Sequence, residues 1–210
     1  NLEILYMGGN HLTSIALVSN MPRMWAFGAW DNQVTSMAPL AGLHGLGYVN
    51  LDDNDITNAV ALTGKTNLTW AYLRNNAIQD LGPLTAATNL GSLNLEGNLV
   101  TNLAPLAGKG RLDWLLLAHN QVTDLAPLAS CTNLVTLSLE NNAITDMSPL
   151  AGLARLDWLQ IRSNRLAALP SFAGLARLRT FDAGFNRIAN VAALTSAPAL
   201  NWFRLEFNDL

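Results

Sequence analysis

The feature of this sequence that most restricts its fold is an asparagine that recurs at a fixed interval of 22 residues. It occupies ten positions with no insertion or deletion between them: Asn10, Asn32, Asn54, Asn76, Asn98, Asn120, Asn142, Asn164, Asn186 and Asn208. A fixed period of about 20–50 residues is typical of repeat proteins, in which each repeat contacts only its neighbours. We therefore expect residues 1–210 to form a single domain of about ten stacked coils.

Apolar residues hold fixed positions around each asparagine. The stretch from Leu90 to Val100 matches the pattern L-x-x-L-x-L-x-x-N-x-L, with valine in the last position, and the coils that begin at Leu112 and Leu134 match it again. This pattern is typical of leucine-rich repeats. The last two leucines before the asparagine alternate, so they share one face of a short strand that points into the coil. The fold predicted is a right-handed α/β solenoid, or horseshoe, with a concave parallel sheet.

The asparagine and the segment after it are expected to serve the scaffold. The asparagine follows the strand, where its amide can bond backbone groups that would otherwise be buried without a partner. Seven residues after five of the asparagines there is a proline that precedes a leucine: Pro39, Pro83, Pro105, Pro127 and Pro149. Proline suits the first turn of a helix, and the segment is short, so we expect a 3-10 or single-turn element on the convex side.

Composition and charge disfavour several classes of function. The net charge is −3, and the sequence contains no block of lysine and arginine of the kind that contacts the phosphates of a nucleic acid. No apolar run approaches the ~18 residues of a membrane-spanning helix. The three histidines have no metal-ligand spacing, and the single cysteine, Cys131, takes a core position that is leucine in other coils. We expect a non-enzymatic protein without a cofactor or a metal.

The stretches Asn142–Leu156 and Asn120–Leu128 resemble the 22-residue repeats of internalin-like bacterial proteins, and the resemblance covers the whole chain. It implies a secreted or cell-surface protein that binds another protein with its concave face. Members of that family usually carry a cap at each end of the repeats, and neither cap is recognisable here. This predicts that the chain is part of a longer protein. It also predicts end-to-end self-association, because an uncapped solenoid exposes apolar edges.

The strand positions that point away from the core vary from coil to coil, and these would face a partner. In the first of three such columns, Trp70, Trp114, Trp158 and Trp202 are spaced by 44 residues. The third column carries charges of both signs, which disfavours a simple polyanion or polycation as the ligand. The candidate binding residues are Trp30, Tyr48, Asp52, Trp70, Tyr72, Arg74, Glu96, Trp114, Glu140, Trp158, Arg162, Trp202 and Arg204.

Three interpretations of this face remain open. The first is recognition of a protein, since interfaces concentrate tryptophan, tyrosine and arginine at their hot spots. The second is a carbohydrate-binding module, because tryptophans on alternate strands would lie ~9.6 Å apart, near the repeat of an extended β-linked disaccharide. The third is a structural or self-assembling solenoid, in which the rings only cover apolar surface and the charges form a solvated face.

Overall fold

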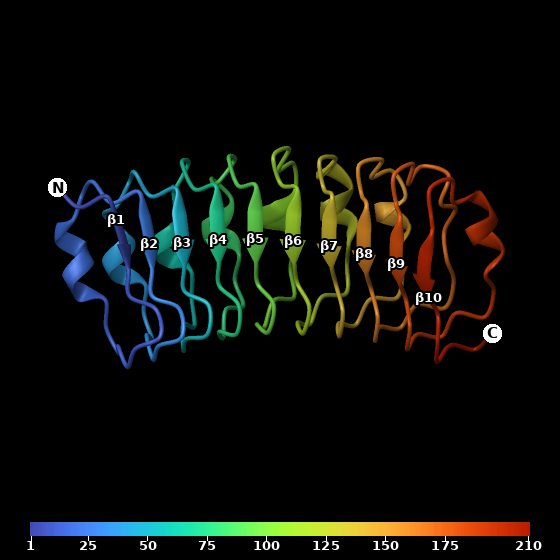
Figure 1. The fold of residues 1–210 in the computed structure, drawn as a ribbon, viewed down its shortest axis with the longest axis horizontal. Coiled ribbons are helices and arrows are strands. Elements are labelled where there is room, and N and C mark those ends of the chain that lie inside the picture. Colours follow the sequence, from blue (N-terminus) through green and yellow to red (C-terminus); the bar gives the residue numbers. More distant parts are fainter.

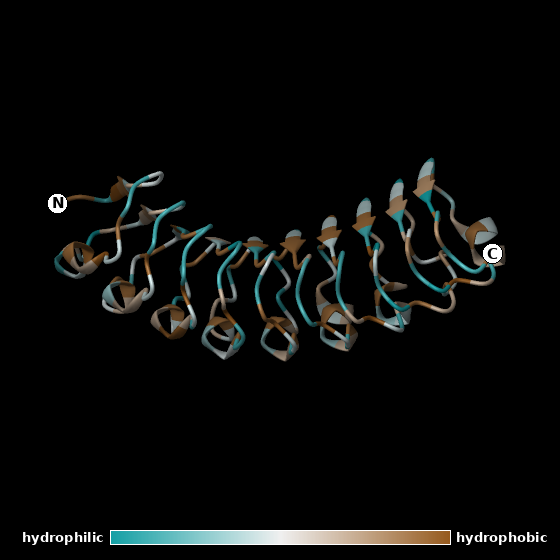
Figure 2. Ribbon diagram, turned by 90° about the horizontal axis from the view of Figure 1, so that it is seen from below, coloured by the Kyte–Doolittle hydropathy of each residue, from teal (hydrophilic) through white to brown (hydrophobic).

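The computed structural model describes residues 1–210 and shows a solenoid in which every coil adds one strand to a single sheet (Figure 1). The solenoid is curved, as the side view in Figure 2 shows. The sheet has ten strands in sequence order, and each pair of neighbours is parallel and shifted by one 22-residue repeat. The strands are β1 (Ile4–Tyr6), β2 (Ala26–Gly28), β3 (Tyr48–Asn50), β4 (Trp70–Tyr72), β5 (Ser92–Asn94), β6 (Trp114–Leu116), β7 (Thr136–Ser138), β8 (Trp158–Gln160), β9 (Thr180–Asp182) and β10 (Trp202–Arg204). The predicted leucine-rich-repeat solenoid is confirmed.

Short 3-10 elements lie on the convex side, across the coil from the strands (Figure 2). They are η1 (Ala16–Asn20), η2 (Ala38–Leu40), η3 (Val60–Leu62), η4 (Gly82–Leu84), η5 (Ala104–Leu106), η6 (Ala126–Ser130), η7 (Ser148–Leu150) and η8 (Ala192–Ser196). Proline lies in the first turn of η2, η4, η5, η6 and η7, as its position in the repeat predicted. Because these elements are wider than the strands, their stacking accounts for the curvature of the sheet.

The coil between β8 and β9 has no 3-10 element, although it contains a proline. Pro170 lies one residue earlier in its repeat than the other prolines, so Leu169 directly precedes it. In a regular coil the residue equivalent to Leu169 adopts a turn conformation, as Leu125 does with φ −101° and ψ −1°. A residue before proline is driven towards extended conformations by the proline ring. The shift of one position therefore removes the 3-10 turn.

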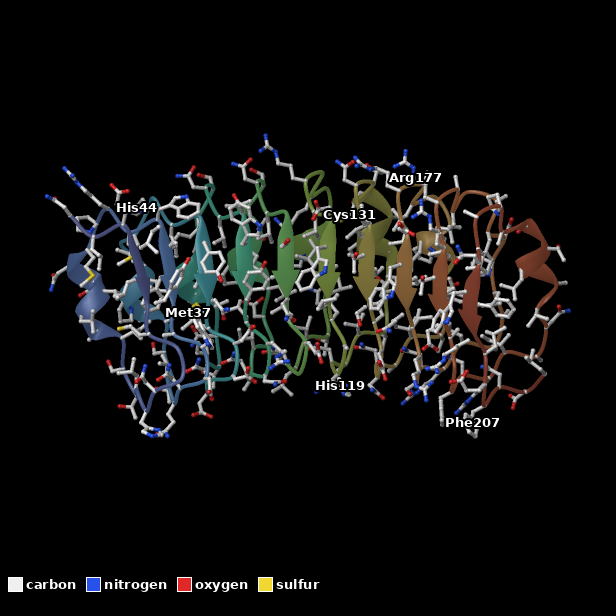
Figure 3. The ribbon with its side chains drawn as sticks, viewed as in Figure 1. Met37, His44, His119, Cys131, Arg177 and Phe207 are labelled. Carbon is white, nitrogen blue, oxygen red and sulfur yellow. The ribbon has the colours of Figure 1, made fainter.

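The core runs the length of the solenoid as one cluster of 53 buried residues. Its main components are the inward strand residues of every coil, such as Leu93 and Leu95, together with the residues that face them from the convex side. Cys131, which Figure 3 labels, is fully buried in this cluster, as its position in the repeat predicted. Its thiol donates a hydrogen bond to the carbonyl oxygen of Leu106 at 3.2 Å.

The repeated asparagines form a ladder of side-chain amides behind one edge of the sheet. The Nδ2 atom of Asn98 donates to the carbonyl oxygens of Leu95 and Glu96 in its own coil and of Leu73 in the preceding coil, while its Oδ1 accepts from the backbone nitrogen of Ile78. Every asparagine from Asn32 to Asn208 makes the same two links to the preceding coil. The ladder therefore joins consecutive coils through bonds that are largely shielded from water.

Candidate functional site

The strand register sets the outward side chains of the concave face in columns. Pairing from β4 to β10 places the four tryptophans that are 44 residues apart in one file: Trp70, Trp114, Trp158 and Trp202, separated by Ser92, Thr136 and Thr180. Trp70 is 37% exposed and Trp202 is 42% exposed, whereas Trp114 and Trp158 are half-buried. The file exists, but its members do not contact one another, because a strand with a small side chain separates each pair.

Aromatic contacts instead run obliquely across the columns, from β1 to β6. The ring centroids of Tyr6 and Tyr48 are 6.0 Å apart, those of Tyr48 and Tyr72 are 5.7 Å apart, and those of Tyr72 and Trp114 are 6.0 Å apart. Trp30 joins this series beside Tyr6, at 5.9 Å. We call these five residues the aromatic band. The rings are tilted by 55–77° to one another, an arrangement worth about 0.5–1.5 kcal/mol per pair beyond the area that it buries.

Two glycines position Trp30 within the aromatic band. A Cβ atom on Gly8 would overlap the indole ring of Trp30, and one on Gly28 would lie 2.8 Å from both the Trp30 and the Tyr6 rings. The indole therefore lies directly against the backbone of two adjacent coils. Gly28 also leaves open the space through which Tyr6 reaches Tyr48 over the intervening strand.

Two aromatic residues of this face were missing from the candidate residues proposed from the sequence. Tyr6 occupies the second outward column of β1, where the 44-residue spacing of tryptophans gives no signal. Trp25 directly precedes β2 and packs against the backbone of Gly47, which has no side chain. The ring centroids of Trp25 and Trp70 are 6.2 Å apart. A search for aromatic residues beside glycines at equivalent positions of neighbouring coils would have found Trp25.

The charged residues at the C-terminal half of the face pair with one another. Nη1 of Arg162 lies 2.8 Å from Glu206, and Nε of Arg162 lies 3.9 Å from Glu140. Arg204 also lies 3.9 Å from Glu206, and its guanidinium group is 5.4 Å from the centroid of the Trp202 ring. These two arginines and two glutamates form a balanced network on the surface of β7 to β10, so each charge is already paired within the protein.

At the N-terminal half, Arg74 forms its ion pair with Asp53, at 2.9 Å, and not with the candidate residue Asp52. Asp52 accepts a hydrogen bond from the backbone nitrogen of Arg74 at 2.6 Å. Burial raises the pKa of Asp52 to about 6, against the opposing effect of Arg74. Burial also acts on Asp53, but hydrogen bonds from Asn75 and Arg74 outweigh it and lower the pKa of that carboxyl group. Glu96, half-buried beside this group, makes no ion pair.

Raising the pH from about 4 to about 7 is expected to lower the free energy of unfolding of the wild-type protein relative to that of an Asp52→Asn variant. Because the pKa is raised from 3.8 to about 6 on folding, the folded state holds the proton more tightly than the unfolded chain. The stability that this proton provides is lost as the pH rises through the folded pKa. Urea denaturation at several pH values measures the difference. Parallel pH curves for the two proteins would contradict this assignment.

The side chains that commonly bind metal ions do not gather at the candidate site. No group of three or more histidine, cysteine, aspartate or glutamate side chains is arranged to hold a metal ion. None of the helical elements has the length and apolar character required to cross a membrane. That the protein is non-enzymatic and acts without a cofactor stays a prediction.

Comparison with known proteins identifies the family. The family model "Leucine Rich repeats (2 copies)" matches residues 66–108 and 111–152, and the model "Leucine rich repeat" matches residues 132–188. An internalin (inlF) from Listeria monocytogenes is 31% identical and aligns over 99% of this chain with a TM-score of 0.95. The chain is an internalin-like leucine-rich repeat protein. It spans 61% of the length of that internalin.

Two further solved structures show how widely this fold occurs. Internalin C2 from Listeria monocytogenes is 29% identical, with a TM-score of 0.75 over 96% of this chain and 80% of its own. A plant peptide hormone receptor, solved in complex with its hormone, is 20% identical and shares the fold alone, with a TM-score of 0.76 over 98% of this chain and 40% of the receptor. No curated protein sequence matches the chain.

Proposed function

We propose that this internalin-like protein binds a protein partner with its concave face, through the aromatic band and the charged residues beside it. The observation that carries the proposal is the band itself, a continuous series of rings in contact from β1 to β6. Tyr6 is 52% exposed and Trp30 is 37% exposed, so the band keeps apolar surface available to a partner. Contiguous aromatic surface on a rigid support is typical of interface hot spots. By relationship to the internalins, we place its action at the cell surface or outside the cell.

The positions of the rings favour tight binding, because they are set before a partner arrives. Gly8 and Gly28 hold the indole of Trp30 against the backbone, and each ring of the band contacts its neighbour. Ordering a mobile side chain at an interface costs about 0.5–1.5 kcal/mol, and rings that are already ordered avoid most of that cost. The remaining candidates, Trp158 and Arg162 among them, would extend the contact area towards β10.

The tilt of the rings favours a protein over a glycan as the ligand. A sugar stacks on an open aromatic face, and successive sugars need faces that are roughly coplanar. In the aromatic band neighbouring rings are tilted by 55–77° to one another, and the pairs Tyr6–Tyr48 and Tyr72–Trp114 are edge-to-face. A protein surface can instead place side chains between tilted rings.

Replacing Tyr72 or Trp114 with alanine is expected to weaken binding of a protein partner at least 30-fold, which corresponds to about 2 kcal/mol. The partner would be captured from cell-surface extracts, purified and titrated by calorimetry against each variant. Val60→Ala is the matched control, because Val60 is exposed in η3 on the convex side. A similar loss in the control, or unchanged binding in both band variants, would contradict the proposal.

The same variants separate the rival interpretations. A saturable change in tryptophan fluorescence on titration with soluble β-linked oligosaccharides, lost in Trp114→Ala, would favour a carbohydrate-binding module. Concentration-dependent association in sedimentation, with no captured protein dependent on Tyr72, would favour a self-assembling solenoid.

A further inference from the structure

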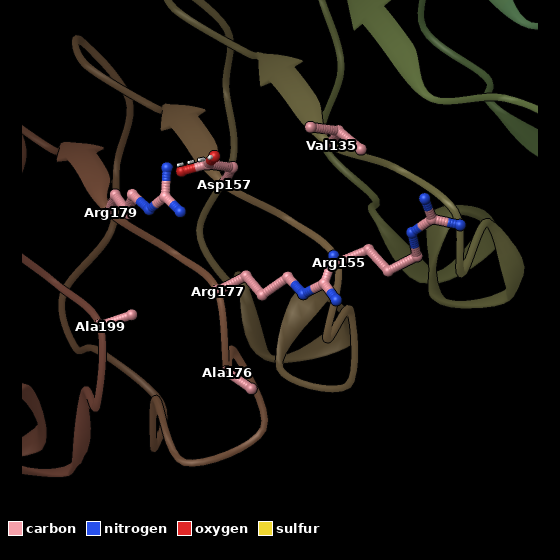
Figure 4. Close-up of a pocket in the computed structure, with 7 residues that line it drawn as sticks. All are labelled: Val135, Arg155, Asp157, Ala176, Arg177, Arg179 and Ala199. Atoms are coloured by element: carbon pink, nitrogen blue, oxygen red, sulfur yellow. Dashed lines mark ion pairs between the residues drawn. The ribbon is translucent and has the colours of Figure 1, made fainter.

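A pocket lined by arginines lies at the edge of the sheet where the chain enters β7, β8 and β9 (Figure 4). Its volume is about 430 Å³. It is lined by seven residues, which are Val135, Arg155, Asp157, Ala176, Arg177, Arg179 and Ala199. We call it the arginine pocket. Figure 3 shows Arg177 at this edge, with His119 and Phe207 at the opposite edge of the sheet. No residue of the aromatic band lines the pocket.

Positive charge in the arginine pocket is not neutralised by the protein. Asp157 is the only carboxylate in the lining, and it lies 3.6 Å from Arg179 in a pair whose arginine side chain is 66% exposed. Such exposed ion pairs are weak and contribute about 0–1 kcal/mol. Arg155 bonds only the neutral amide oxygen of Asn133, at 2.8 Å, and Arg177 has no hydrogen-bond or ion-pair partner. Neither of these two guanidinium groups is paired with a carboxylate, so both keep a charge that can attract an anion.

The other coils show that the scaffold does not need these arginines. At the positions equivalent to Arg155 and Arg177, the side chains of Asn67, Asn89 and Asn133 each donate a hydrogen bond to a carbonyl oxygen of the preceding coil. The two arginines make no such bond. Arg155 still contacts the preceding coil through the side-chain amide oxygen of Asn133, whereas Arg177 makes no contact of this kind and leaves free positive charge at the rim.

Neighbouring residues leave the guanidinium groups accessible. Ala199 takes the same position as Arg177 in the next coil, and Ala176 precedes Arg177, so no long side chain fills the space between them. Asp157 and Arg179 directly precede Trp158 and Thr180, the outward residues at the start of β8 and β9. The lining of the arginine pocket is therefore continuous with the concave face, and a protein bound on that face can contact both.

We propose that the arginine pocket binds an acidic segment of a protein partner, with its carboxylates paired to Arg155 and Arg177. This inference rests on the proposed function, since it assigns part of the same partner. A guanidinium group presents two parallel N–H donors that match the two oxygens of a carboxylate. The lining holds three arginines against the single carboxylate of Asp157, so it attracts anions. Because the pocket adjoins the concave face on which we propose that a protein binds, the anion that it would meet is an acidic segment of that protein.

The test uses a hexaglutamate peptide with blocked ends, titrated by calorimetry against the intact chain. We expect binding that weakens at least tenfold in the double variant Arg155→Gln, Arg177→Gln, and that weakens as the salt concentration rises. The matched control is Arg165→Gln, Arg187→Gln, which removes two exposed arginines from adjacent coils at the opposite edge. That control is expected to change the affinity less than twofold. Hexaglutamine is expected not to bind.

Each alternative outcome overturns the proposal. Equal weakening in the control variant would show attraction by general charge only. Tighter binding of inorganic phosphate or of a sulfated oligosaccharide, with the same loss in the pocket variant, would assign the pocket to another class of anion. Tyr72→Ala is expected to leave hexaglutamate binding unchanged. Loss of partner binding in Tyr72→Ala, with no effect of the pocket variant on hexaglutamate, would therefore contradict the pocket alone, and the reverse result would contradict the aromatic band alone.

Discussion

Replacing Asn98 with alanine is expected to lower the free energy of unfolding by about 3–4 kcal/mol, although its side chain bonds only to backbone groups. Its amide bonds four backbone groups, and the residue is 4% exposed. A net hydrogen bond contributes about 1 kcal/mol, and a buried group left without a partner costs about 1–3 kcal/mol more. The carbonyl oxygens of Leu73 and Leu95 keep bonds from the ladder asparagines of adjacent coils, so the backbone nitrogen of Ile78 bears most of the penalty.

Urea denaturation measures the loss of stability, and hydrogen exchange locates it. The amide of Ile78 is expected to exchange faster in Asn98→Ala, because its acceptor is removed while the fold is retained. The control is Asn102→Ala, whose exposed side chain on the convex side accepts a bond from the backbone nitrogen of Ala104. Asn102→Ala is expected to lower the free energy of unfolding by less than about 1 kcal/mol, as is typical of the loss of an exposed side-chain cap. Equal losses in the two variants would contradict the role of the ladder.

Replacing Lys109 with alanine is expected to cost about 3–5 kcal/mol of unfolding free energy, the range for truncating a large core residue. Lys109 is 3% exposed and takes the core position that leucine holds in other coils. Its Nζ donates to the carbonyl oxygens of Leu84, Ala87 and Thr85 at 2.8, 3.1 and 3.3 Å. Alanine would leave a cavity and remove the donor that these carbonyl groups share at the end of η4.

The other lysine of the chain, Lys65, provides a matched comparison for the effect of removing Lys109. Lys65 is 1% exposed at the same position of an earlier coil, but its Nζ donates to a single carbonyl oxygen, that of Ala41 at 2.7 Å. Lys65→Ala is expected to cost about 1–2 kcal/mol less than Lys109→Ala, because fewer acceptors lose their donor. Lys109→Met fills the cavity without restoring the donor, so its loss should be intermediate. A cost for Lys65→Ala equal to or above that of Lys109→Ala would contradict this account.

The scaffold could be predicted from the sequence because its determinants are local and repeated. Ten asparagines in phase place ten strands, and the prolines that follow five of them place the 3-10 turns. The one coil between strands that lacks a 3-10 turn also has a local cause, because its proline, Pro170, lies one position earlier in the repeat. Cys131 was assigned to the core by comparing it with leucines at the same position. Each of these inferences needs only the period and the chemistry of one residue.

The burial of Lys65 and Lys109 could also have been expected from their position in the repeat. Both occupy the column of core leucines, yet lysine is almost never fully buried unless it is paired. The carbonyl oxygens that pair with them are contributed by the preceding coil, 22–25 residues earlier. The sequence alone did not show that these carbonyl groups converge on one point.

The sequence by itself determined the solenoid, the strand register and which side chains face outward, because a strict 22-residue period leaves a single way to stack the coils. Only the tertiary structure decided which of those side chains meet. The aromatic band crosses three columns, since Gly28 and Ser92 let rings make contact over an intervening strand. The arginine pocket forms between adjacent coils at the rim. Both depend on diagonal distances across a curved surface, which a one-dimensional repeat does not contain.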